Sequence, residues 1–217
     1  TSLMALKHIA GRLKVPGLVE GVREFLTENP NDKLGDGETP RRLVLFTQHI
    51  DVANELEKGI NAVLDEDFPN VNHVLRIRGD STPAEKKETA TNCALYHWPT
   101  NDPFDRILIC STLSGGEGLN LQSAYDGWLC ERQWNPANER EQPAGRFTRH
   151  GSKAKNVFFT TWTCLGTVEE QIAEINKRKD TYTPNLTGEL SETPWDESSV
   201  MMEIAAAMRD RRRRLGK

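Results

Sequence analysis

The chain has 217 residues, enough for one large domain or two small ones, and its hydrophobic fraction of 36% suits a folded chain with a core. Its 28 Lys and Arg against 32 Asp and Glu leave a net charge of −4, so any basic surface of the kind that binds nucleic acid must be local. The sequence has no C-x-x-C pair, which excludes a zinc-ribbon or disulfide framework. It also has no signal peptide and no apolar run near the roughly 18 residues of a membrane span. We therefore expect an intracellular protein with no membrane partner.

Residues 1–28 are predicted to form two helical segments separated at Pro16-Gly17, because Pro interrupts a helix. A loop is expected from 29 to 40, where Asn, Asp, Gly and Pro accumulate. Each expected helix carries one apolar stripe for packing: Leu3, Leu6, Ile9 and Leu13 on the first, and Val19, Val22, Phe25 and Leu26 on the second. Residues 1–40 are therefore expected to be a helical lead-in and loop.

From residue 41, short apolar runs alternate with amphipathic stretches as far as residue 180. Strands are expected at 43–46, 71–77, 107–110, 128–130 and 157–160, and helices at about 50–64, 83–97, 138–147 and 167–178. This alternation predicts an α/β domain over 41–180, in which helices cover both faces of a mostly parallel sheet. The chemistry of such a sheet lies at the carboxyl ends of its strands.

Residues 181–217 are predicted to be a linker followed by a short helix from about Ser198, which ends in an Arg-rich run at 209–214. Two interpretations of this basic tail stay open: contact with phosphate, or ordinary solvation of a charged chain end.

The densest motif is the segment 111–121, STLSGGEGLNL, directly after the strand expected at 107–110. Three glycines in four residues at a strand's carboxyl end allow backbone N–H groups to approach a phosphate closely. A tight turn before a helix would explain the same glycines, so local reasoning leaves both interpretations open.

A second motif follows, with Trp134-Asn135-Pro136 before Gln142, Arg146 and Arg149. On a helix, these last three side chains lie at i, i+4 and i+7 and share one face. A guanidinium keeps its charge and grips phosphate in a planar fork, which suits a phosphoryl-transfer site. The alternative is a solvated helix face with salt bridges to nearby glutamates.

Together and in this order, the motifs of 41–180 resemble the second RecA-like lobe of superfamily 2 helicases, and within that superfamily the SWI/SNF-like double-stranded DNA translocases. The matching segments are VLFTQ at 44–48, RGDST at 78–82, the Gly-rich segment at 111–121, Trp-Asn-Pro with Q-x-x-G-R-x-x-R, and TVEE at 167–170. The chain departs from the family in having one extra residue between Pro136 and Gln142, Pro143 after the Gln, Ser152 after Gly151, and the charged Glu117. The family's acid before Trp-Asn-Pro also has no clear counterpart at 131–133.

The resemblance implies a RecA-like fold and a role for each motif. Arg146 and Arg149 would be arginine fingers directed at the γ-phosphate of ATP on a partner lobe, with Gln142 beside them. Gly116, Glu117 and Gly118 would lie near the ribose and phosphates of the nucleotide. Sequence-independent contacts to the DNA backbone would come from Gln48, Gly79, Ser81, Thr82, Ser111, Thr112 and Asn120. Trp134 would approach a groove of the duplex, the alternative being a core position beside the sheet.

The sequence contains neither a G-x-x-x-x-G-K-[ST] loop nor an Asp-Glu-x-His box, the elements that cradle the ATP phosphates and hold Mg²⁺. We therefore expect the C-terminal half of a two-lobe motor, inactive as an ATPase by itself. Its expected partners are double-stranded DNA and the N-terminal RecA-like lobe of the same protein, which would hold ATP and Mg²⁺. No metal is expected on this chain.

Three other interpretations are compatible with parts of the sequence. They are the lobe of a strand-separating DNA or RNA helicase, a non-catalytic RecA-like interaction module, and an unrelated doubly wound α/β protein that uses Gly115–Gly118 as a phosphate loop. The Trp-Asn-Pro element disfavours the first, and the paired arginines disfavour the other two. The expected location is cytoplasmic for a bacterial or phage protein and nuclear for a eukaryotic one.

Overall fold

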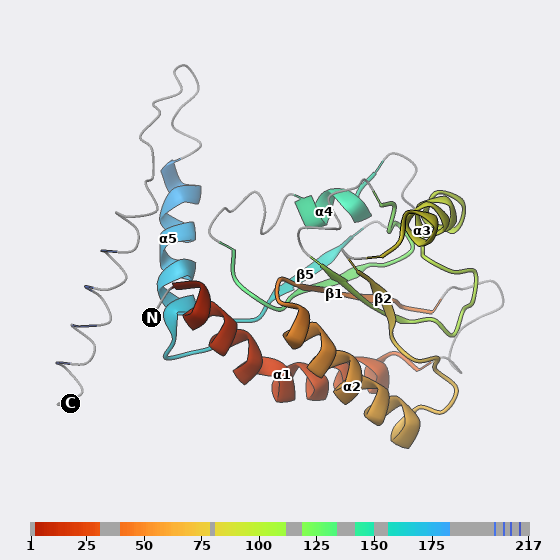
Figure 1. Ribbon diagram of the computed structural model, residues 1–217, viewed down its shortest axis with the longest axis horizontal. Coiled ribbons are helices and arrows are strands. Elements are labelled where there is room, and N and C mark those ends of the chain that lie inside the picture. Colours follow the sequence, from red (N-terminus) through yellow and green to blue (C-terminus); the bar gives the residue numbers. More distant parts are fainter. Residues whose placement is uncertain are drawn as a thin grey trace, which may run out of the picture.

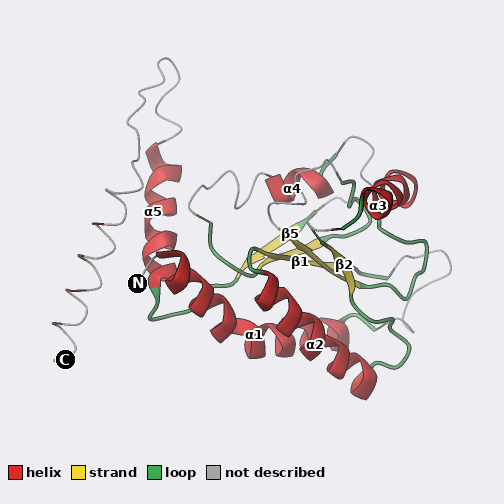
Figure 2. Cartoon of the chain, viewed as in Figure 1, coloured by secondary structure: helices red, strands yellow, loops and turns green. Residues whose placement is uncertain are grey.

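The computed structural model describes residues 3–30, 40–78, 81–111, 119–133, 142–149 and 156–182, and the single positions 202, 206, 209 and 213. The helices in this part are α1 (Leu3–Glu28), α2 (Ile50–Asp67), α3 (Pro83–Tyr96), α4 (Gln142–Phe147) and α5 (Val168–Tyr182), and the strands are β1 (Leu43–Thr47), β2 (Leu75–Ile77), β3 (Ile107–Ser111), β4 (Asp126–Leu129) and β5 (Phe158–Thr161). Figure 2 shows these helices arranged around one sheet.

The five strands form one sheet in the order β2-β3-β1-β4-β5, and every pairing is parallel. The central strand β1 joins both neighbours in register, with Phe46 opposite Cys110 of β3 and Leu129 of β4. Helices α1 and α2 lie on one side of the sheet, and α3 and α4 lie on the other (Figure 1). The expected parallel α/β sheet with both faces covered is confirmed.

The alternation of side chains along β1 supplies a core on each face of the sheet. Leu43 and Leu45 belong to the cluster formed with α1 and α2. Val44 and Phe46 belong to the opposite cluster, which includes Phe147 of α4. All four β1 side chains are at most 1% exposed. A strand that is buried on both faces has a continuous run of apolar residues, so this strand can be recognised from the sequence.

Helix α1 corrects two predictions. It continues through Pro16 from Leu3 to Glu28, where two helices were expected. Both Pro16 and Arg12 are exposed, so water can bond the Arg12 carbonyl that loses its helical N–H partner. The buried face also differs from the expected stripe, because Ile9 and Leu13 are 52% and 63% exposed.

The buried face of α1 carries lysines in place of those apolar residues. Lys7 and Lys14 are 1% and 7% exposed, and they lie two helical turns apart. Farther along, Gly21 allows the helix to approach the sheet, since a Cβ there would lie 2.9 Å from the Trp162 ring. At its other end, α1 packs against α5 through Leu3 and other apolar side chains (Figure 1).

Candidate nucleotide and DNA interface

The parallel sheet gathers most of the described candidate residues along one edge. Gln48 follows β1, Ser81 and Thr82 lie beyond the end of β2, and Ser111 is the last residue of β3. The carboxyl ends of parallel strands meet at the same edge, which is where open α/β sheets bind ligands. Several candidates lie outside the described residues: Gly79, Thr112, Gly116, Glu117, Gly118, Trp134 and the side chain of Gln142.

Gln48 is held within the lobe by both its backbone and its side chain. Its N–H donates to Glu131 Oε2, and its Oε1 accepts from Lys7 Nζ at 2.9 Å and from Gln133 Nε2 at 3.3 Å. Glu131 is 2% exposed, and burial raises the pKa of its carboxyl group. Glu131 therefore links Gln48, the residue after β1, to the end of β4. The resemblance of the motifs did not indicate this role.

The segment before Trp134 is fixed by helix α5. The Arg132 N–H donates to Glu169 Oε1 at 3.3 Å, and Asn176 Nδ2 donates to the Gln133 carbonyl at 2.7 Å. Glu169 is 0% exposed and pairs with Lys14 Nζ at 2.7 Å. We call Lys7, Lys14, Gln48, Glu131, Gln133, Glu169 and Asn176 the buried polar network.

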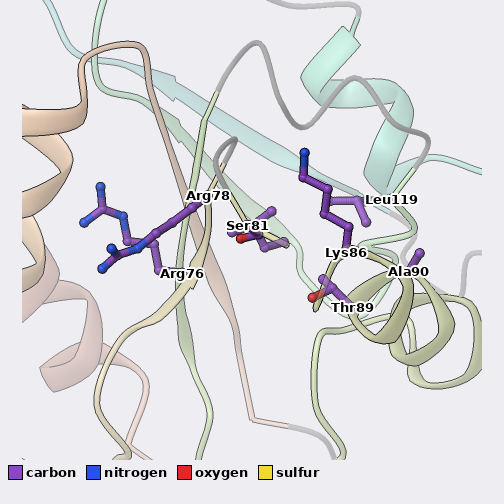
Figure 3. Close-up of a pocket in the computed structure, with 8 residues that line it drawn as sticks. Arg76, Arg78, Ser81, Lys86, Thr89, Ala90 and Leu119 are labelled. Atoms are coloured by element: carbon purple, nitrogen blue, oxygen red, sulfur yellow. The ribbon is translucent and has the colours of Figure 1, made fainter. Parts of the chain in front are cut away.

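Thr82 and Ser81 differ in what their hydroxyl groups do. Thr82 caps α3 in a capping box, in which its Oγ1 accepts from the Glu85 N–H at 3.3 Å and the Thr82 N–H donates to Glu85 Oε2 at 2.7 Å. Ser81 is half-buried and lines a cavity with Arg76, Lys86 and other side chains (Figure 3). The structure thus gives Thr82 a local structural task and leaves Ser81 at a hollow of the surface.

Asn120 points toward the end of α3. Its Nδ2 lies 2.8 Å from His97 Nδ1, and its buried Oδ1 has no hydrogen-bond partner in the structure. His97 ends α3 in the left-handed conformation, with φ of 57°. The predicted contact of Asn120 with the DNA backbone therefore requires its Nδ2, the donor that a phosphate oxygen needs, to turn away from His97 Nδ1. Ser111 is half-buried at the end of β3.

The two arginines on and after α4 occupy different surroundings. Arg146 is 4% exposed, and its guanidinium lies 5.5 Å from the centre of the Phe46 ring and 3.9 Å from Cys110 Sγ. Burial lowers the pKa of this guanidinium, and the charge of Arg149 adds to the effect. Arg149 is exposed, and its Nε donates to the Gly145 carbonyl at 3.2 Å. The spacing predicted that both arginines lie on one helix face, but Arg146 is buried and Arg149 is exposed.

The backbone beside these arginines is bonded to the end of the Gly-rich motif. The Leu121 N–H donates to the Arg146 carbonyl at 3.0 Å, and Gln122 Nε2 donates to the Arg149 carbonyl at 2.8 Å. Gln122 is 6% exposed. These bonds join the segment that follows the predicted phosphate loop to the helix that carries the predicted fingers.

Sequence reasoning missed the buried polar network because its members lie far apart along the chain, with a separation of 155 residues between Lys14 and Glu169. One sequence signal of this network was present, since Lys7 and Lys14 are seven residues apart and share a helix face.

No cluster of three metal-ligating side chains occurs among the described residues, and none of the described helices meets the length and hydropathy that a membrane span requires.

Comparisons with known proteins agree with these motifs. No protein-family model matches the chain. The chain is 34% identical over 106 residues, 49% of its length, to the Arabidopsis thaliana protein CHROMATIN REMODELING 25, and it covers 11% of that relative. It is 28% identical over 168 residues, 76% of its length, to the DNA repair and recombination protein RAD54 of Oryza sativa subsp. japonica, of which it covers 15%. The chain thus spans a small part of these curated relatives.

A solved structure shows the fold. The C-terminal part of the Fun30 ATPase domain superposes with a TM-score of 0.55 and 24% identity, covering 72% of this chain and 44% of that one. This likeness confirms the RecA-like architecture expected from the alternating strands and helices. The curated relatives include chromatin-remodelling and DNA-repair proteins, which agrees with the resemblance of the motifs to the SWI/SNF-like helicases.

Proposed function

We propose that this chain is the second lobe of an ATP-driven double-stranded DNA translocase. The whole motor would include an N-terminal RecA-like lobe that holds ATP and Mg²⁺, because these 217 residues contain no Walker A loop. The printed names of the relatives, which refer to chromatin remodelling and to DNA repair and recombination, support a DNA substrate and hence an intracellular location.

The observation that carries this proposal is the pair of hydrogen bonds from Leu121 and Gln122 to the carbonyls of Arg146 and Arg149. They join the motif proposed to contact DNA, through Asn120, to the helix proposed to contact ATP. A shift of α4 when the lobes close would therefore be transmitted to the DNA-facing edge of the sheet. Such a junction is what a motor needs to couple nucleotide state to its grip on a strand.

Arg149 is the arginine best placed to reach nucleotide on a partner lobe, because its side chain is exposed beyond α4. ATP, when bound there, would present a γ-phosphate whose transferring charge a guanidinium stabilises. Arg146 would join it only after its guanidinium leaves the Phe46 ring, 5.5 Å away. Gln142, Gly116, Glu117 and Gly118 complete the proposed nucleotide contacts.

The proposed DNA contacts follow the carboxyl edge of the sheet. Gln48, Ser81 and Ser111 lie at this edge among the described residues, with Asn120 beside the end of α3. Gly79, Thr82, Thr112 and Trp134 complete the proposal. Hydroxyl, amide and backbone N–H donors of this kind hold phosphates without reading sequence, which suits an enzyme that moves along any duplex.

The test is ATPase activity, with and without duplex DNA, for this chain alone and for the chain joined to its N-terminal lobe. We expect no turnover alone and DNA-stimulated turnover when joined. In the joined protein, Arg149→Ala should lower kcat by about three to five decades while DNA binding stays near its original value. Arg12→Ala is the matched control, since Arg12 is also an exposed arginine and pairs with Glu55 on the surface. Unchanged turnover in Arg149→Ala would refute its assignment as a finger.

A further inference from the structure

A cavity lies at the edge of the sheet opposite to the edge that gathers the proposed DNA contacts. Arg106, which directly precedes β3, and Leu26 of α1 line it, and each is 1% exposed. Thr27, Asp67 and Asn70 also line it and are exposed, so the cavity opens at the surface. Its volume is about 400 Å³, within the roughly 300–1,000 Å³ of ligand-binding sites.

Arg106 is a buried cation that has no carboxylate partner in the described part of the chain. Its Nε and Nη2 donate to the Arg41 carbonyl at 3.1 and 2.9 Å, and its guanidinium lies 5.9 Å from the centre of the Phe25 ring. Burial lowers the pKa of Arg106 to about 10, so the side chain keeps its charge at pH 7. Asp67 at the mouth of the cavity pairs with Arg23 instead. An anion in the cavity would therefore offset the cost of burying this charge.

The geometry of Arg106 favours a carboxylate as that anion. The bonds to Arg41 use the Nε side of the guanidinium and leave its Nη1–Nη2 end, which can donate to both oxygens of a carboxylate. One guanidinium balances the single charge of a carboxylate, whereas a phosphate monoester carries almost twice that charge. Leu26, Phe68 and Val71 also line the cavity, so the carboxylate should be accompanied by apolar groups.

A segment of another protein fits this place better than a free small molecule. Phe104 adjoins the cavity, because it lies two residues before Arg106 and its carbonyl accepts from the N–H of Asn72, the neighbour of Val71, at 3.0 Å. Phe104 is 45% exposed, so apolar surface continues beyond the cavity, where only a longer ligand would cover it. We propose that the cavity docks an acidic, apolar segment of a partner protein, with an Asp or Glu carboxylate on Arg106 and an apolar side chain against Phe68 and Val71.

The experiment selects binders from a phage-displayed library of random peptides on the immobilised full chain, with counter-selection on Thr27→Trp. This substitution places an indole at the mouth of the cavity and should disturb α1 little, since Thr27 is exposed and its Oγ1 donates to the Arg23 carbonyl of the same helix at 2.8 Å. Thr91→Trp is the matched control. Thr91 is exposed on α3, its Oγ1 donates to the Lys87 carbonyl at 2.8 Å, and it does not line the cavity.

The selected sequences are the first readout. Peptides that bind the unaltered chain and Thr91→Trp, and that fail to bind Thr27→Trp, should contain an Asp or Glu beside apolar residues. The proposal is wrong if the selection yields no such class of peptide, or if the peptides that depend on the cavity carry no acid.

A cycle of charge removal then tests the pairing with Arg106. Fluorescence anisotropy compares a selected peptide with its counterpart in which the matching amide replaces the acid. On the unaltered chain the amide peptide should bind about 10- to 100-fold more weakly, because hydrogen bonds to charged groups are the strong ones. On Arg106→Gln the two peptides should bind equally, a result that a merely structural effect of the substitution would not give. Arg106→Lys should restore the preference for the acid, and circular dichroism checks that each variant is folded.

Two further outcomes concern the class of ligand. Phe104→Ala should weaken binding of the peptide, since the ring extends the contact beyond the cavity. Phenylbutyrate, a free carboxylate with an apolar ring, should not displace the peptide at the concentrations at which the peptide itself binds. Displacement at those concentrations would identify a small-molecule site and overturn the proposal. The proposed motor function is not affected by any of these results, because the assays contain neither DNA nor ATP.

Discussion

Removing one partner of the buried ion pair between Lys14 of α1 and Glu169 of α5 is predicted to destabilise the lobe strongly. The Lys14 side chain is 6% exposed and that of Glu169 is 0% exposed. Lys14 Nζ also donates to the Trp162 carbonyl at 3.1 Å. The substitution Lys14→Met keeps most of the side-chain volume and removes the charge, so Glu169 is left buried without its cation.

The expected loss follows from what remains around Glu169. Its carboxylate would keep the N–H groups of Arg132, at 3.3 Å, and Cys164, at 2.8 Å. Two neutral donors do not replace a cation in a buried site, and removing one partner of a buried pair typically costs about 3–5 kcal/mol. For a chain of this length, 1 kcal/mol corresponds to roughly 2–4 °C in Tm, so we expect Tm to fall by roughly 6–20 °C.

Urea and thermal denaturation followed by circular dichroism measure this loss. The double variant Lys14→Met/Glu169→Gln removes the isolated charge and should be more stable than Lys14→Met alone, because a neutral buried amide is far less costly than an unpaired carboxylate. Asp65→Asn is the control, since the Asp65–His73 pair is 69% and 60% exposed and should leave the midpoint unchanged. A Lys14→Met loss below about 1 kcal/mol, or strictly additive losses, would refute the reasoning.

Two further predictions concern packing and thiol chemistry. Gly127→Ala should destabilise the lobe by about 1–3 kcal/mol in the same urea titration, because the new Cβ would lie 2.4 Å from the Phe159 ring; an unchanged midpoint would mean that the ring moves aside at no cost. Iodoacetamide at pH 8 should modify Cys164, which is the one cysteine among the four that is not fully buried, and should spare the others. The thiolate is the reactive form, and burial raises the pKa of Cys93 to about 12 and that of Cys110 to about 11. Mass spectrometry counts the labels, and fast labelling of a second cysteine in the folded chain would contradict this.

The strands and most helices could be predicted because their signals are local. The run Leu43–Phe46 is apolar on both faces of the sheet and reads as a buried strand whatever surrounds it. The Pro83 start of α3 follows from Thr82 and Glu85, which form a capping box within four residues of sequence. Local propensity and tertiary structure agree at these positions, and there the expected bounds differ from the observed ones by only a few residues.

The path of α1 could not be predicted because its determinants are not local. Pro16 is a strong local signal for a break, yet it lies on the exposed face, where the lost hydrogen bond is replaced by water. The buried face contains Lys7 and Lys14, whose partners Gln48 and Glu169 are distant in sequence. A pattern search for apolar stripes assigns such lysines to solvent.

The candidate site shows the same division. The order of strands predicted the edge of the sheet at which Gln48, Ser81 and Ser111 lie, because the ends of strands can be recognised in the sequence. The spacing of Arg146 and Arg149 predicted one shared face, but whether a side chain there is buried depends on Phe46 and Cys110, which come from other strands. Burial of one arginine and exposure of the other is a tertiary property.

The contacts of α1 extend to the sheet edge at which the proposed DNA contacts lie. A Cβ at Gly11 would lie 2.8 Å from Glu131 Oε1, so glycine at this position allows α1 to pack close to the Glu131 side chain after β4. Lys7 reaches Gln48 at that same edge. A chain lacking α1 would expose the apolar face that packs against Leu43 and Leu45 and would leave Glu131 without the nearby lysine charge. The helix is therefore part of the structure that positions the proposed DNA-contacting residue Gln48, although it precedes every motif that carries the resemblance to the family.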